Sequence, residues 1–172
     1  MTLAITSIAK SILLLSCSFE APRKIIVPYL QSIGINSDLI EKVMIIIENM
    51  SFRKELDSNK KTSAEFIERY IVQDADRLDA IGAIGIARCF SYGATRGTPL
   101  YSHDSSAMTE MTFEQYNEQT KKSQGTSLNH FYEKLFKLKD LMRTESGKQL
   151  AQERHEFMKL FVQQFKNEVG IN

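Results

Sequence analysis

The sequence predicts an all-α protein, a single helical bundle of about five or six helices. Two observations support this fold class. Every long segment spaces its apolar residues three and four positions apart, which is the period of a helix, and no segment sustains the alternation of a strand. Residues that favour helix starts, and glycines that favour helix ends, fall where this period begins and stops. The length of 172 residues suits one domain with a sizeable core.

The first half of the chain contains three predicted helices. The first covers Pro22–Gly34, with Gly34 ending it and Pro28 in a position that disturbs it. Ser37 is predicted to cap the second helix, which continues to Met50. A capping box at Thr62–Glu65 opens the central helix. We expect this helix to continue as one piece through Gly82 and Gly85, with both glycines allowing close approach of another helix.

The second half contains a loop-rich segment and two further helices. Gly93–Gln124 is predicted to hold at most one short helix, near Thr112–Gln119. Ser127 opens a helix to about Met142, and Thr144 opens the last one, which reaches about Val169. On the last helix the predicted core residues are Leu150, Phe157, Leu160, Phe161 and Phe165, whereas Arg154 and His155 are expected to be structural.

Composition excludes several kinds of partner. The chain has 22 basic and 21 acidic residues and a net charge of +1, so nucleic acid is not an expected partner. Cys17 and Cys89 are isolated, as in reduced cytoplasmic proteins. Met1–Phe19 is apolar but too short and too rich in hydroxyls for a good membrane span, so no membrane is expected. This segment fits a partly buried helix, a signal-like stretch or a replaced start. The sequence does not determine the oligomeric state.

The run from Ile71 to Arg88 places three carboxylates, Asp74, Asp76 and Asp79, in an otherwise apolar stretch. On a helix, Asp76 and Asp79 share an inward stripe and Asp74 lies roughly opposite. Apolar residues surround this helix, which predicts burial on nearly all sides. Buried carboxylates need a positive partner, which could be a metal, a substrate cation or an arginine. Arg77 and Arg88 are close enough in sequence to form purely structural pairs.

The segment IVQDADRLDAIGAIGIAR closely resembles the terminal-aspartate helix of the HD-domain superfamily of metal-dependent phosphohydrolases, in an uncharacterised bacterial-type branch. The likeness continues through FSYGATRGTPLY and SLNHFYEKLFKLKDLMRTESGKQLAQERHEFMKLFVQQF, and backwards through YLQSIGINSDLIEKVMIIIENMSF. The resemblance covers roughly Glu20 to Val169. It implies a helical fold, a divalent metal (magnesium, manganese or another transition metal) and a phosphorylated small molecule or nucleotide as substrate.

The resemblance also implies which residues form the site. The superfamily's metal site takes a His, then an adjacent His-Asp pair, and finally an Asp in an A-D-x-L setting, which matches Asp76. Asp79, Asp74 and Arg77 are candidate auxiliary residues around this ligand. His130 and Lys134 are adjacent on one helical face and are candidates for contacting an anionic substrate, although a solvated lysine face is the simpler interpretation.

The chain departs from the family pattern in its histidines. His103, His130 and His155 all follow Asp76, so the first His and the His-Asp pair have no counterpart. We therefore expect an N-terminally shortened HD-like domain at residues 20–172, with residues 1–19 divergent or replaced. Its hydrolytic activity is expected to be impaired or absent. The alternative is a degenerate HD domain that binds a nucleotide or a protein partner.

Overall fold

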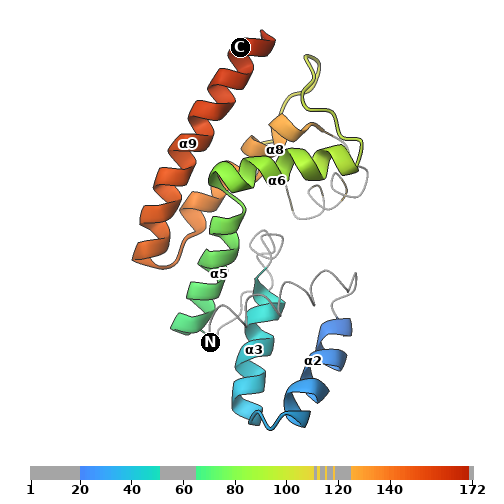
Figure 1. Ribbon diagram of the computed structural model, residues 1–172, viewed down its shortest axis with the longest axis vertical. Coiled ribbons are helices and arrows are strands. Elements are labelled where there is room, and N and C mark those ends of the chain that lie inside the picture. Colours follow the sequence, from blue (N-terminus) through green and yellow to red (C-terminus); the bar gives the residue numbers. More distant parts are fainter. Residues whose placement is uncertain are drawn as a thin grey trace.

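The computed structural model describes residues 20–50, 65–110 and 125–170, together with Thr112, Gln115 and Glu118. These residues form six α-helices and one 3-10 helix, without a strand among them, which confirms the all-α prediction (Figure 1). The predictions for Met1–Phe19, for the start of the capping box at Thr62 and for most of the short helix near Thr112–Gln119 lie outside the described residues.

Helices α2 (Glu20–Ser32) and α3 (Ser37–Asn49) form a hairpin that projects from the rest of the fold (Figure 1). Their shared core is built from Ile26, Ile40 and Met44, all of which are buried. Asn36 rather than Ser37 caps α3, because the Asn36 side chain accepts a hydrogen bond of 2.9 Å from the Leu39 amide. The predicted cap was therefore one residue late.

The predicted central helix is two helices, α5 (Ile67–Asp79) and α6 (Gly82–Thr95), so the expectation of one continuous helix is wrong. Gly82 has φ of 75°, in the left-handed region that favours glycine. A Cβ at Gly85 would lie 2.3 Å from the Ala80 carbonyl oxygen, so only glycine permits the turn there. A Cβ at Gly82 would lie 2.9 Å from Arg154 Cγ, so the expected close approach of another helix occurs at Gly82.

The helix predicted from Ser127 to Met142 is also interrupted. It comprises α8 (Ser127–Glu133) and a 3-10 helix, η1 (Leu135–Leu141), separated by Lys134 with φ of −140° and ψ of −57°. The helix begins at Ser127 as predicted, and Thr126 caps it, since the Thr126 hydroxyl accepts a hydrogen bond of 3.1 Å from the Asn129 amide.

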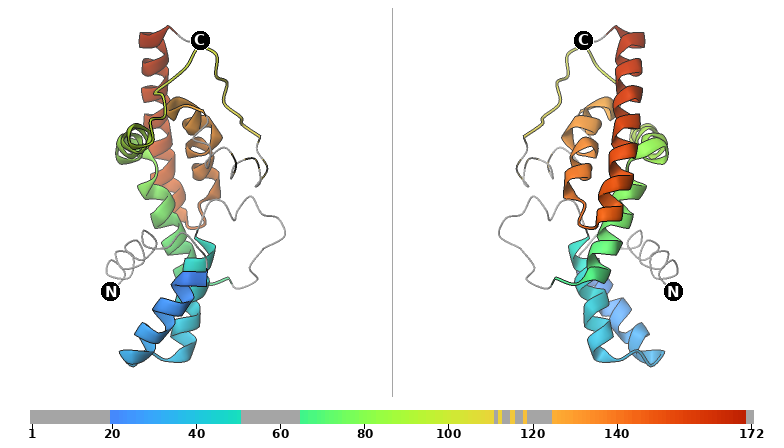
Figure 2. Two further views of the ribbon diagram at one scale, coloured as in Figure 1. Left: turned by 90° about the vertical axis from the view of Figure 1, so that its right-hand side faces the viewer. Right: turned by 90° about the vertical axis from the view of Figure 1, so that its left-hand side faces the viewer.

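The last helix, α9 (Glu145–Val169), begins and ends as predicted. Thr144 is its N-cap and Gly170, with φ of 69°, follows its last residue. Figure 2 shows α9 standing upright with η1 beside it, while α6 crosses α9 and is seen nearly end-on. Together with α8, which packs on α6 and η1, these elements form the main body. No helix in the described part of the chain combines the length and apolarity needed to cross a membrane.

The main core lies where α6, α8, η1 and α9 meet. Its most deeply buried members are Ile81, Phe131, Leu138, Ala151 and Met158. Phe161 and Phe165 pack against this core, as predicted. The predicted core positions Leu150, Phe157 and Leu160 are wrong, because all three side chains are exposed. Ala151, Met158 and Val162 define the inward side of α9, and the three exposed residues lie well around the helix from them.

Candidate functional site

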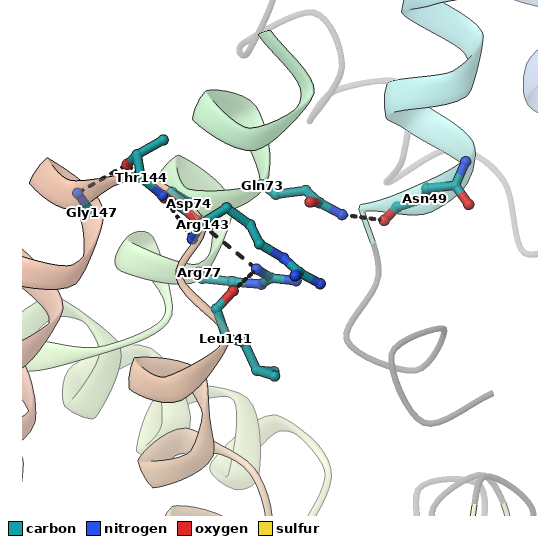
Figure 3. Close-up of polar contacts among 8 residues, drawn as sticks. All are labelled: Asn49, Gln73, Asp74, Arg77, Leu141, Arg143, Thr144 and Gly147. Atoms are coloured by element: carbon teal, nitrogen blue, oxygen red, sulfur yellow. Dashed lines mark hydrogen bonds and ion pairs between the residues drawn. The ribbon is translucent and has the colours of Figure 1, made fainter. Parts of the chain in front are cut away.

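The three aspartates of α5 have different environments, and Asp74 is the most buried of them, with 2% of its surface exposed. Its Oδ1 accepts a hydrogen bond of 2.9 Å from the Arg143 amide. Its Oδ2 accepts bonds of 2.7 Å from both the amide and the hydroxyl of Thr144 (Figure 3). The Thr144 hydroxyl in turn accepts a bond of 3.0 Å from the Gly147 amide. Asp74 therefore anchors α5 to the first turn of α9.

Gly147 is required at this anchor because the neighbouring side chains leave no room for a Cβ atom. A Cβ at this position would lie 2.4 Å from Asp74 Oδ2 and 2.8 Å from Thr144 Oγ1. In a capping box the residue three positions after the N-cap is Glu or Gln, whose side chain accepts from the N-cap amide. Here that residue is glycine, and Asp74 from another helix accepts from the Thr144 amide instead.

Two further side chains of α5 complete this junction. Arg77 is 3% exposed, and its Nη1 lies 3.9 Å from Asp74 Oδ1 while donating to the Leu141 carbonyl at the end of η1 (Figure 3). Gln73 donates from Nε2 to the Asn49 carbonyl at the end of α3, at 2.8 Å. Residues 73, 74 and 77 thus hold α5 against α3, η1 and α9.

These contacts correct the predicted orientation of α5. Asp74 was expected on the side opposite the inward stripe, but it is the deepest of the three carboxylates. The expectation of a helix buried on nearly all sides is also wrong, because Ile71 and Ala75 are exposed. The buried side of α5 carries polar residues that form hydrogen bonds with the ends of α3, η1 and α9. The positions of apolar residues in the sequence do not predict such contacts.

Asp79 lies at the other end of α5, where solvent reaches it. Its carboxylate forms an ion pair with Arg88 of α6, across the turn between the two helices. Two of the three carboxylates therefore lie beside arginines: Asp74 beside Arg77 and Asp79 beside Arg88. These are the two arginines that the sequence offered as structural partners.

Asp76, which the sequence resemblance predicts to be a metal ligand, is half-buried on the same side of α5 as the buried Val72. Within the described residues, no group of three or more His, Cys, Asp or Glu side chains could hold a metal ion. A divalent transition metal needs several such ligands converging on one point. The described residues therefore do not fit a resident metal of this kind.

The histidines lie elsewhere in the fold. The ring of His103 packs edge-on against Tyr101, with centroids 5.6 Å apart. His155 packs edge-on against Phe136, with centroids 5.3 Å apart, and burial lowers the pKa of its imidazole. His155 thus has the structural surroundings that the sequence predicted.

His130 and Lys134 share one local environment with a residue that sequence reasoning did not select, Cys89. Burial, and to a lesser degree the charge of Lys134, lower the pKa of His130 to about 4, so His130 is neutral near pH 7. Burial raises the pKa of Cys89 to about 11 although Lys134 opposes the shift, and the thiol contacts the Ser127 carbonyl at 3.6 Å. The helical spacing of His130 and Lys134 predicted their proximity, whereas only the packing of α6 on α8 brings in Cys89.

Comparison with known proteins agrees with this fold. A structure from Lactobacillus plantarum is 40% identical, with a TM-score of 0.81 over 98% of this chain and 76% of its own. An HD-superfamily hydrolase from Bacillus thuringiensis is 36% identical, with a TM-score of 0.69 over 99% of this chain and 74% of its own. The chain matches no protein-family profile. These likenesses define an all-α protein of the HD type, and the chain belongs to the HD superfamily.

A curated relative, the uncharacterised protein YpgQ from Bacillus subtilis, is 39% identical over 140 residues. That match covers 81% of this chain but only 58% of YpgQ. YpgQ has also been crystallised in complex with ADP, and that structure has a TM-score of 0.61 against this chain. The chain therefore spans a little more than half the length of this relative.

Proposed function

We propose that this chain is an HD-superfamily phosphohydrolase domain that recognises a phosphorylated small molecule or nucleotide, and whose 172 residues hydrolyse it poorly or not at all. Hydrolysis is the proposed type of reaction because a similar protein of known structure is an HD-superfamily hydrolase. Recognition of a nucleotide is supported by the ADP complex of YpgQ. Asp76, with Asp79, Asp74 and Arg77 around it, is the proposed remainder of the metal site.

The proposal of low hydrolytic activity rests on the small number of available metal ligands. In the superfamily that the sequence resembles, three of the four metal ligands precede the final aspartate. Every histidine in this chain follows Asp76. Asp74 is committed to Thr144 and the Arg143 amide, and Asp79 to Arg88. Removing even a residue that supports a metal ligand typically costs about 10–100-fold in affinity or activity. Asp76 with at most one further carboxylate would hold Mg²⁺ weakly and a transition metal poorly.

His130 and Lys134 are the proposed anion-binding residues. A neutral imidazole beside an ammonium can donate one hydrogen bond to a phosphate oxygen while the lysine supplies charge. Burial, and to a lesser degree the charge of Lys134, lower the pKa of His130 and keep its imidazole neutral near pH 7. A cytoplasmic setting, expected from the isolated cysteines, remains part of the proposal.

Calorimetric titration with ADP tests recognition. The chain should bind ADP with similar affinity in EDTA and in Mg²⁺, and Lys134→Ala should weaken binding by about tenfold. Lys148→Ala, on the exposed surface of α9, is the matched control and should leave binding unchanged. Absence of ADP binding, or equal loss in both variants, would contradict the proposal.

A second candidate is a helical interaction domain without catalytic or nucleotide-binding function. The arginine partners of Asp74 and Asp79 favour it, because they give both carboxylates a structural role. ADP-dependent thermal stabilisation separates the two, since only a nucleotide-binding domain gains stability from the ligand.

A further inference from the structure

The segment Pro99–Glu110, called the strap below, belongs to no helix or strand but is hydrogen-bonded to α8 and η1 at its start, middle and end. At its start, the amides of Ser127 and Leu128 donate to the carbonyls of Pro99 and Leu100, at 2.9 and 3.0 Å. The first amides of a helix have no partner inside the helix, so these carbonyls complete the beginning of α8.

Further along, the strap covers two polar side chains of α8. Asn129 and Glu133 lie one turn apart and are only 7% and 5% exposed. Asn129 Nδ2 donates to Ser105 Oγ at 2.8 Å, and the Met108 amide donates to Glu133 Oε1 at 3.3 Å. Burying a polar side chain is costly unless it has a hydrogen-bond partner, and the strap provides one to each of these residues.

The end of the strap meets the break between α8 and η1. The helix α8 ends at Glu133, and Lys134, with φ of −140° and ψ of −57°, separates it from η1. Met108 holds Glu133 on one side of the break. The next residue, Thr109, accepts through its carbonyl from Lys137 Nζ on the other side. Two consecutive residues of the strap therefore hold both sides of the break that contains Lys134.

We propose that Glu133 is a positioning residue for nucleotide binding. By accepting from the Met108 amide, its carboxylate fixes the break and with it the direction of Lys134 toward the phosphate groups of a nucleoside diphosphate. This inference rests on the proposed function, in which Lys134 binds the anion, and in it neither Glu133 nor Met108 touches the ligand. The negative charge of Glu133 would by itself disfavour a phosphate nearby, so its benefit is geometric: a binding group must be held within about 0.5 Å of its working position.

Calorimetric titration of the full chain with ADP in EDTA tests this inference through Met108→Pro. Proline lacks the amide hydrogen that Glu133 accepts, and the substitution changes no charge. ADP binding should weaken by about fivefold. Met108→Ala keeps the amide and should restore wild-type binding, because the Met108 side chain is 45% exposed. In a Lys134→Ala background, Met108→Pro should cost less than about twofold, since its effect passes through Lys134.

Glu133→Ala gives a second test in which two explanations predict opposite signs. If only its charge mattered, removing a carboxylate near an anion site would tighten ADP binding. Loss of the positioning contact should instead weaken ADP binding by about threefold or more. Circular dichroism and thermal unfolding show whether each variant is folded. If one of Glu133→Ala and Met108→Pro does not fold, the other decides.

The outcomes separate this inference from the proposed function. Unchanged ADP binding in Met108→Pro, an equal loss in Met108→Ala, or tighter binding in Glu133→Ala would overturn the inference alone. So would a loss from Met108→Pro that is equally large with and without Lys134. Absence of ADP binding by the wild type would overturn it together with the proposed function.

Discussion

Asp74 and Asp76 are two residues apart on one helix, and their surroundings are opposite in kind. Asp74 is buried and accepts hydrogen bonds from Arg143 and Thr144, beside the guanidinium of Arg77. Asp76 is half-buried and is the residue that we propose as the remaining metal ligand. Neighbouring carboxylates on one helix can therefore have different roles. One member fixes the helix to the fold, and this holds the other at a defined position.

The largest expected effect comes from removing the anchoring carboxylate. Asp74→Ala should lower the free energy of unfolding by about 3–5 kcal/mol, because it leaves Arg77 buried without its carboxylate and removes the acceptor for Thr144. Asp76→Ala should change it by less than about 1 kcal/mol. Urea denaturation followed by circular dichroism measures both. Similar losses in the two variants would remove the distinction between the residues.

A smaller effect is expected from filling the space beside the anchor. Gly147→Ala should destabilise the fold by about 2 kcal/mol, because the added methyl group would displace Asp74 or Thr144. Ser146→Ala, at an exposed position in the same turn of α9, is the matched control and should stay within about 0.5 kcal/mol. Thermal unfolding compares the two. If Gly147→Ala were as stable as the control, the anchor would adapt freely to the added methyl group.

The pH dependence of stability tests the surroundings of His130. Its pKa in the fold is about 4, below the ordinary 6.5, so the unfolded chain binds a proton first as the pH falls. The stabilising contribution should be complete above about pH 6.5 and be lost progressively as the pH falls toward about 4. His130→Gln should flatten this part of the profile, while His155 still titrates in both proteins. An identical slope in the variant would contradict the buried, neutral His130.

The smallest effect is expected at the solvent-exposed pair. Arg88→Ala should cost less than about 1 kcal/mol, because its ion pair with Asp79 is screened by water. The cost, measured by urea denaturation, should decrease further in about 0.5 M salt. A loss as large as that of Asp74→Ala would mean that Asp79, like Asp74, is a structural anchor.

Periodicity predicted the fold class, the existence of the main helices and both ends of α9 correctly. It failed where backbone conformation interrupts a helix, at Gly82 and Lys134, because an apolar pattern continues across a break. It also misjudged α9, where Leu150, Phe157 and Leu160 fit a core pattern but face solvent.

The role of Asp74 depends on the Arg143 and Thr144 amides, which lie 69 and 70 residues further along the chain. No local pattern around Asp74 encodes that contact. The glycine at the third position of α9, where a capping box has Glu or Gln, is the one sequence signal that another chain segment enters there. Cys89 was likewise missed, because only the packing of α6 on α8 places it beside the Ser127 carbonyl.

The most direct test of the account is the metal content and phosphoester turnover of the purified 172-residue chain, measured together for the wild type and for Asp76→Asn. We expect substoichiometric transition metal after exposure to Mn²⁺ and exchange into metal-free buffer, and nucleotide hydrolysis close to the buffer blank in both proteins. About one equivalent of tightly held metal, with turnover of ADP or a generic phosphoester that Asp76→Asn abolishes, would contradict the account.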